Sequence, residues 1–134
     1  MLVVDENLCD RRILQAISRW YPGQVLPVMA LRPGSLIKDE AIPVLLRGVS
    51  HPTFVTINVT DFWKKSPAHR TYAIINIALP KERAHEVPDI LQQVLRQPAF
   101  KTKAARMGKV IHVSANRIQF YEADRRIQSV AWQV

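Results

Sequence analysis

The chain has 134 residues, 48% of them hydrophobic and 22% charged, which suits one globular domain with a core and is too short for two. This composition excludes disordered, collagen-like and coiled-coil chains. A net charge of +8 favours a polyanionic partner, above all nucleic acid. The single Cys9 cannot form an intrachain disulfide, and no apolar run reaches the roughly 18 residues of a membrane span. We therefore expect a soluble, cytoplasmic protein with no membrane association.

The charge is unevenly distributed along the sequence. Residues 1–61 contain six basic and six acidic residues, whereas residues 62–134 contain thirteen basic and five acidic residues. Between Asp89 and Glu122 there is no acidic residue at all. The acids of the first half fall in three tight groups. A metal site beside a phosphate-binding surface requires this kind of segregation, although solvated faces also cluster by chance.

The predicted elements alternate between strand and helix over the first hundred residues. Hydrophobic periodicity and turn residues predict strands at 2–4, 24–29, 53–59 and 72–79, a loop at 32–35, and helices at about 10–21, 39–48 and 87–95. Asp10 is the expected N-cap of the first helix, and Pro43 is tolerated only in the first turn of the second. This alternation predicts a three-layer α/β domain with a mainly parallel central sheet.

The C-terminal segment has a different pattern. Strand-like runs at 109–113, 117–121 and 127–132 are separated by short turns, which predicts an antiparallel meander. We therefore expect a single domain over 1–134, with an α/β core at 1–106 and a C-terminal β extension at 107–134.

Three carboxylates fall at the ends of predicted elements. Asp5 and Asp61 follow strands, and Asp39 begins a helix, with Glu6 and Glu40 adjoining them. Ligands bind outside the carboxyl ends of parallel strands, so these side chains can converge. Each close pair would repel by roughly 1–4 kcal/mol, and Mg²⁺ or Mn²⁺ would remove that repulsion. The alternative is that each Asp only caps a turn or a helix.

At these residues the sequence resembles the PIN-like superfamily of metal-dependent ribonucleases, in particular its short branch, which is similar to VapC-type toxins. The matching segments are Val3-Val4-Asp5-Glu6-Asn7-Leu8, Lys38-Asp39-Glu40-Ala41-Ile42 and Thr60-Asp61-Phe62-Trp63. The resemblance covers about residues 1–100. It implies that Asp5, Asp39 and Asp61 are the catalytic, metal-binding carboxylates, with Glu6 a weaker ligand.

The resemblance also implies a function. It predicts an endoribonuclease that uses Mg²⁺ or Mn²⁺ to hydrolyse RNA phosphodiesters, as the toxin of a toxin-antitoxin pair with a small antitoxin partner. A homodimer is left open. The branch often has an Asp two positions before the Asp-Phe pair, where this chain has Val59. Val59 therefore favours the alternative of a catalytically degenerate PIN-like module that binds RNA or protein.

Basic residues of the second half are the candidate RNA contacts. Lys64, Lys65 and Arg70 follow Asp61 closely, so they are placed to hold a phosphate beside a metal. A second group contains Lys101, Lys103, Arg106 and Lys109, which either bind phosphate or form a solvated turn. His69 is a candidate proton donor, but a lone loop histidine is more often simply solvated.

Two other classes of protein fit the sequence less well. A phosphoacceptor receiver domain needs a Lys-Pro after its last strand, and the chain contains no Lys-Pro dipeptide. A Cys-His hydrolase is not supported either, because Cys9 has no local partner and the remaining histidines show no ligand spacing.

Overall fold

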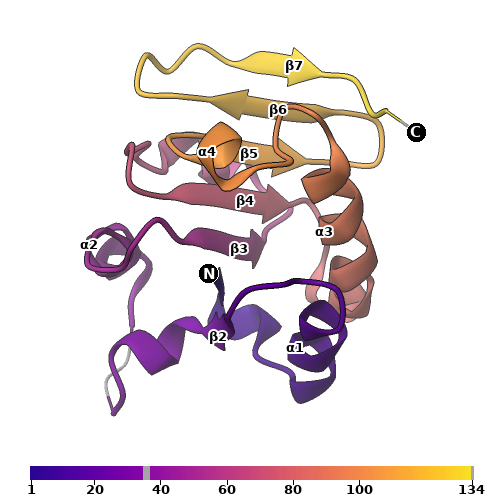
Figure 1. The fold of residues 1–134 in the computed structure, drawn as a ribbon. Coiled ribbons are helices and arrows are strands. Elements are labelled where there is room, and N and C mark those ends of the chain that lie inside the picture. The colour runs from indigo at the N-terminus through magenta and orange to yellow at the C-terminus, as the bar shows by residue number, and fades with distance from the viewer. Residues whose placement is uncertain (35–36, 134) are drawn as a thin grey trace.

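A seven-stranded mixed sheet organises the computed structural model, which describes residues 1–34 and 37–133 (Figure 1). The strand order is β2-β1-β3-β4-β5-β6-β7. The strands are β1 (Leu2–Val4), β2 (Val25–Pro27), β3 (Thr53–Ile57), β4 (Ala73–Ile77), β5 (Val110–Val113), β6 (Ile118–Tyr121) and β7 (Gln128–Val130). Pairing is parallel from β2 through β5 and antiparallel from β5 through β7. The predicted α/β class and mainly parallel sheet are confirmed.

The predicted C-terminal strands are also present, with one difference in their pairing. β5 pairs antiparallel with β6, as a meander requires, but on its other side it pairs parallel with β4. Ile74 to Ile77 of β4 lie opposite Val110 to Val113 of β5. The strand at 110–113 therefore completes the parallel sheet, and the hairpin of β6 and β7 extends that same sheet.

The first helix begins after the predicted cap Asp10 but ends at Ser18, before the predicted end near residue 21, and the short helix at 103–106 was not predicted. The helices are α1 (Arg11–Ser18), α2 (Ile42–Arg47), α3 (Val87–Arg96) and α4 (Lys103–Arg106). The 3₁₀ turns are η1 (Glu6–Leu8), η2 (Val28–Leu31), η3 (Asp39–Ala41), η4 (Asp61–Lys65) and η5 (Lys81–Glu86). The Asp10 side chain accepts a hydrogen bond from the N–H of Arg12, and Pro43 lies in the first turn of α2.

The loop predicted at 32–35 is described only in part. Residues 32–34 form a turn in which Gly34 has a φ of 77°, a left-handed conformation that glycine adopts without strain. Ser35 lies outside the described residues.

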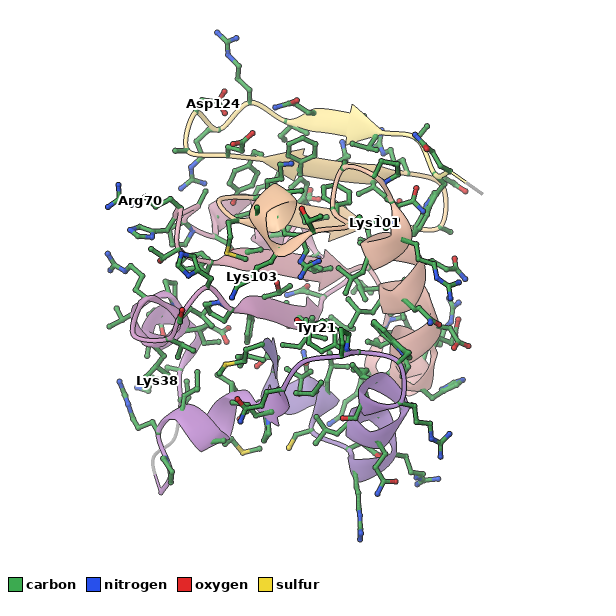
Figure 2. All side chains as sticks on the ribbon, viewed as in Figure 1. Tyr21, Lys38, Arg70, Lys101, Lys103 and Asp124 are labelled. Atoms are coloured by element: carbon green, nitrogen blue, oxygen red, sulfur yellow. The ribbon has the colours of Figure 1, made fainter. Side chains whose placement is uncertain are left out.

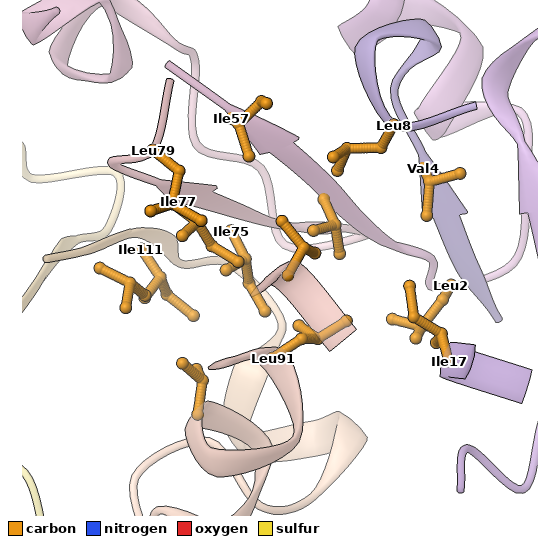
Figure 3. Packing of buried hydrophobic residues seen from close by; sticks show 14 of the residues in the cluster. Leu2, Val4, Leu8, Ile17, Ile57, Ile75, Ile77, Leu79, Leu91 and Ile111 are labelled. Atoms are coloured by element: carbon orange, nitrogen blue, oxygen red, sulfur yellow. The ribbon is translucent and has the colours of Figure 1, made fainter. Parts of the chain in front are cut away.

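Two separate hydrophobic cores cover the two faces of the sheet. On one face, α1 and α3 pack over inward residues such as Val4, Ile75 and Ile111 (Figure 3). On the other face, α2, η2 and η4 pack over Val3, Ile74 and their neighbours. Figure 1 shows α1 and α3 on one side of the sheet and α2 on the other. Strand residues alternate between these cores, as period-two side-chain geometry requires, which gives the three layers.

Among the described residues, no helix has the length and apolar character needed to cross a membrane.

Candidate functional site

The strand order places a crevice at the carboxyl ends of β1 and β3. In the order β2-β1-β3-β4-β5, the chain leaves β1 toward α1 on one face and leaves β3 toward η4 on the other. Connections that depart in opposite directions leave a gap between the two strands. In open parallel sheets such a switch point is where ligands bind.

A cleft of about 560 Å³ is present at this position. Its carboxylates are Asp5, Glu6, Asp39 and Glu40, and its polar side chains are Asn7, Thr56, Asn58, Lys65, Ser66 and Asn76. The apolar walls come from Ile42, Pro43, Phe54, Ile57, Trp63, Pro67 and Ile74. The structure therefore brings together Asp5, Glu6 and Asp39, three of the four carboxylates predicted from the sequence to bind metal.

Asp5 is the most tightly held of these carboxylates. Its N–H donates to the carbonyl of Val55, which continues the β1–β3 pairing beyond the strand. Its Oδ1 accepts the N–H of Glu6 at 2.8 Å, and its Oδ2 accepts the hydroxyl of Thr56 at 2.7 Å. Two hydrogen bonds from neighbouring elements fix the carboxylate in one orientation, as a metal ligand or a catalytic group requires.

The electrostatics of the cleft act against ionisation of Asp5. Burial raises the pKa of Asp5, and the nearby charges of Asp39 and Glu6 raise it further. The hydrogen bonds from Thr56 and the Glu6 N–H act in the opposite direction and reduce the rise. The carboxylates thus interact across the cleft, and a bound cation would relieve their repulsion.

Asn7 contributes a second oxygen of the kind that hard cations prefer. Its Nδ2 donates to the carbonyl of Ile57 at 3.0 Å and contacts the hydroxyl of Thr56 at 3.4 Å. Its Oδ1 is buried without a hydrogen-bond partner. A buried amide oxygen with no donor is uncommon, because leaving it unpaired costs about 1–3 kcal/mol. The residues present therefore suit Mg²⁺ or Mn²⁺ in having carboxylate and amide oxygens in one cleft.

Asp61 does not join this cleft, contrary to its predicted role. Three residues, 58–60, separate the end of β3 from η4, and Asn58 lines the cleft whereas Asp61 does not. The Asp61 side chain is 84% exposed, and its Oδ2 lies 3.9 Å from Nζ of Lys64. Within residues 1–34 and 37–133, no three His, Cys, Asp or Glu side chains are arranged so that they would hold a metal ion.

The predicted RNA contacts divide between the carboxyl ends and the amino ends of the parallel strands. Lys65 lines the cleft, and exposed Lys64 is its neighbour. Exposed Lys103 begins α4, whose Arg106 donates to Thr53 Oγ1 at the start of β3. Burial lowers the pKa of the Met1 amino group, and the charge of Lys103 lowers it further. Figure 2 shows Lys101 and Lys103 near α4. This segment therefore lies at the amino ends of the strands, away from the carboxylates.

Arg70 and Lys109 also lie near the amino ends of the strands, before β4 and β5. The backbone of Arg70 passes beside Gly108, immediately before β5. Lys109 is half-buried, with its ammonium over the rings of Phe100 and Phe120 at 5.6 and 4.9 Å. The aliphatic stem and charge of Lys109 thus serve packing as well as solvent contact.

Arg106 must be removed from the candidate RNA contacts. The residue is only 5% exposed, and its guanidinium donates to Thr53 Oγ1 and to the carbonyls of Phe100 and Lys101. The sequence of a basic segment does not show whether an arginine faces solvent or donates hydrogen bonds to buried carbonyls.

Sequence reasoning missed Thr56 and Asn76 as members of the site. The available signal was a polar residue within an apolar strand, since Asn76 interrupts an otherwise continuous isoleucine run. Thr56 and Asn76 lie opposite each other in the β3–β4 pairing. With Asp5 beside Thr56, they form a polar row across β1, β3 and β4 at the floor of the cleft.

A second cleft, of about 980 Å³, lies on the face covered by α3. It runs past Leu79, Ile90, Arg96 and Trp132. None of the sequence-predicted site residues lines it. Size alone does not identify a functional site, so we place the candidate chemistry in the smaller cleft.

Comparison of the chain with protein-family models, curated proteins and solved structures found no match.

Proposed function

We propose that the chain is a metal-dependent endoribonuclease whose reaction takes place in the cleft between β1 and β3. The observation that carries the proposal is the meeting of Asp5 and Asp39, which are remote in sequence, in one cleft at the topological switch point. The charge of Asp39 contributes to the raised pKa of Asp5, which supports their proximity. The family resemblance of the sequence supports the same reaction class.

We assign metal binding, phosphate binding and orientation of Asp5 to different residues of the cleft. Asp5, Asp39 and Asn7 would hold a divalent cation, with Glu6 in support. When bound, such a cation supplies charge neutralisation and Lewis acidity at a phosphodiester. Lys65 would hold a phosphate oxygen by a charge-assisted hydrogen bond. Thr56 and the N–H of Glu6 would keep the Asp5 carboxylate oriented.

The experiment compares metal binding and cleavage in the same variants. Titration of Mn²⁺ by calorimetry and cleavage of a mixed RNA panel would be measured for the wild type, Asp5→Asn and Asp39→Asn. Asp89→Asn is the matched control, because Asp89 is exposed on α3 and does not line the cleft. We expect each cleft variant to lose about 10- to 100-fold in metal affinity and in rate. Wild type that neither binds Mn²⁺ nor cleaves RNA contradicts the proposal.

A second candidate is a module of the same fold that binds RNA or protein without catalysis. The exposure of Asp61 favours it, because that position would supply a metal ligand in the active branch that the sequence resembles. Val59 is 66% exposed, so the position where an additional Asp is often found faces solvent. Salt-sensitive RNA binding in EDTA without cleavage in Mn²⁺ would select this candidate over the nuclease.

A further inference from the structure

The proposed hydrolysis uses the carboxylates of the cleft and gives its apolar lining residues no role in the reaction. The exposed lining residues include Glu6, Asp39 and Glu40, whereas the buried ones are almost all apolar. The buried lining residues are Ile42, Phe54, Ile57, Trp63, Ile74 and Asn76, with exposed fractions from 2% to 7%. We use the name inner pocket for five of them and leave out Ile57, which packs in the core on the other face of the sheet. The four apolar side chains belong to the hydrophobic core on this face of the sheet and also line the cleft, although a cation and a phosphate need none of them.

Asn76 is the polar member of the inner pocket, and its amide orientation is fixed. Its Nδ2 lies 3.0 Å from Nδ1 of His112 and 3.4 Å from the carbonyl oxygen of Asn58. Burial lowers the pKa of His112, which keeps the ring neutral and able to accept at Nδ1. Trp63 stacks on His112 with the ring centroids 4.6 Å apart, which holds the imidazole in place.

These contacts use both amide hydrogens of Asn76 and leave its oxygen for a ligand. In the described part of the chain, Asn76 Oδ1 has no hydrogen-bond partner, and Asn76 lines the cleft. An apolar pocket with one fixed hydrogen-bond acceptor suits a polar heteroaromatic ring better than an alkyl chain or an ion. In RNA such rings are available only where a base is unpaired and splayed out of the stack.

We propose that the inner pocket binds one unpaired nucleobase next to the phosphate that is cleaved, and that the oxygen of Asn76 selects its edge; this inference rests on the proposed ribonuclease function. Asn76 and Asp5 belong to one polar row, separated by the single strand β3. Neighbouring strands lie about 4.8 Å apart, so the pocket and the carboxylates are roughly 10 Å apart, a distance suited to the base and phosphate of one nucleotide.

The chemistry of Asn76 predicts which bases bind. An acceptor oxygen pairs with the exocyclic amino group of adenine or cytosine, whereas uracil and guanine present a carbonyl oxygen at that position. We expect adenine and cytosine to be preferred by about threefold to tenfold, the range for one neutral hydrogen bond. Paired bases cannot enter the inner pocket. Single-stranded RNA is therefore the expected substrate class, and duplex RNA is rejected.

The test uses the four nucleoside 5′-monophosphates as probes, with affinities measured by calorimetry in EDTA. Wild type should bind the adenosine and cytidine compounds about threefold to tenfold tighter than the uridine and guanosine compounds. Asn76→Leu should remove the preference, because it removes the acceptor oxygen. Asn116→Leu is the control, since Asn116 is exposed in the turn between β5 and β6. Equal affinities in the wild type overturn the inference, as does an unchanged preference in Asn76→Leu.

A second variant keeps the test independent of Asn76 and of hydrolysis. Ser66 is half-buried in the cleft wall, so Ser66→Trp should fill the inner pocket and abolish nucleotide binding while Mn²⁺ affinity stays unchanged. Nucleotide binding that survives this substitution overturns the inference. A base preference without RNA cleavage would reject the nuclease and keep the pocket, whereas cleavage without a base preference would do the reverse.

Discussion

At the residue scale, Asp5 combines a fixed orientation with an unfavourable charge. Its two carboxylate oxygens accept hydrogen bonds from Glu6 and Thr56, and yet burial raises its pKa. A group that served only as a turn cap would gain from being ionised and exposed. Asp5 therefore costs stability in the metal-free protein, and this cost is measurable.

We predict that Asp5→Asn changes the dependence of stability on pH. Folded Asp5 keeps its proton to higher pH than the unfolded chain does, because its pKa is raised. The free energy of unfolding should therefore fall as the pH rises from the ordinary carboxyl pKa to the raised one. Asn has no charge to lose, so urea unfolding across this range should show a flatter curve and a more stable variant at neutral pH. Asp89→Asn should leave the slope as in the wild type; an equally steep slope in Asp5→Asn refutes the assignment.

Asp61 provides a direct comparison between the sequence-based role and the geometry. Its carboxylate is exposed and pairs only loosely with Lys64 at 3.9 Å. An exposed ion pair contributes about 0–1 kcal/mol, so Asp61→Asn should change the cleavage rate by less than about fivefold. Asp5→Asn should lower the same rate by about 10- to 100-fold. Equal losses in single-turnover cleavage would show that η4 moves Asp61 into the cleft when RNA binds.

At the element scale, the C-terminal hairpin holds η4 against the sheet. The Tyr121 hydroxyl donates to the carbonyls of Trp63 and Ser66, and burial raises the pKa of Tyr121 to about 12. Arg125 lies over the Tyr121 ring and donates to the carbonyl of Lys64 at 2.9 Å. The hairpin thus positions the turn that supplies Trp63 and Lys65 to the cleft.

We predict that Tyr121→Phe loosens η4 without unfolding the sheet. The substitution removes the Tyr121 donor to the carbonyls of Trp63 and Ser66, and the Trp63 carbonyl keeps only the N–H of Ser66, so the free energy of unfolding should fall by about 1–3 kcal/mol. Amide hydrogen exchange of residues 61–66 should become faster, because local opening then costs less. Tyr21→Phe is the control, since in the part of the chain that the structure describes the Tyr21 hydroxyl accepts a single hydrogen bond, from the Met1 amino group at 3.4 Å, and does not touch η4. Unchanged exchange in η4 would show that the Trp63 stack alone holds it.

Elements were predictable from sequence because their signals are local. Asp10 acts through a side-chain hydrogen bond to the next turn, and Pro43 and Gly48 act through their own backbone, so each marks a helix end near its own position. The strand at 110–113 was also predictable, but its parallel partner was not, since that pairing depends on residues far away in sequence. The convergence of Asp5 and Asp39 was predictable from a strand end and a helix start, whereas the exposure of Asp61 depends on how η4 packs against residues far away in sequence.

At the scale of the whole molecule, the charge is divided between the two ends of the sheet. The cleft at the carboxyl ends holds four carboxylates and Lys65. The amino ends carry exposed Lys103, together with buried Arg106 beside Thr53. Sequence alone did not show that these two groups of basic residues lie apart, because the direction of each strand in the folded sheet decides at which end of the strands a loop lies.

We predict that the two groups of lysines differ in their effect on RNA binding. The double substitution Lys64→Gln and Lys65→Gln should lower the slope of log K against log salt by up to about 1.4, given about 0.7 per contact with a single strand. The substitution of Lys101 and Lys103 by Gln should leave the slope unchanged, because these lysines lie at the amino ends of the strands, away from the cleft. A larger effect from Lys101 and Lys103 would place the RNA along the amino ends of the strands.

A toxin-like role predicts a partner that covers the cleft. Four carboxylates make a surface complementary to an Arg or Lys side chain, which would neutralise them and displace a cation. Expression in a heterologous bacterium should arrest growth for the wild type and not for Asp5→Asn, and coexpression of the small open reading frame next to the gene should restore growth. Harmless expression of the folded wild type contradicts this role.

The parallel order of the sheet also has a consequence for how the chain folds. β1 pairs on both sides with strands made later, and its pairing with β3 joins residues about fifty positions apart. Non-local pairs form slowly because loop-closure entropy is paid first, whereas the β5–β6 and β6–β7 hairpins close locally within about 1–10 μs. In the complete chain, the carboxylates at the ends of β1 and β3 therefore meet late, after the C-terminal hairpins have closed, so formation of the cleft is a late step of folding.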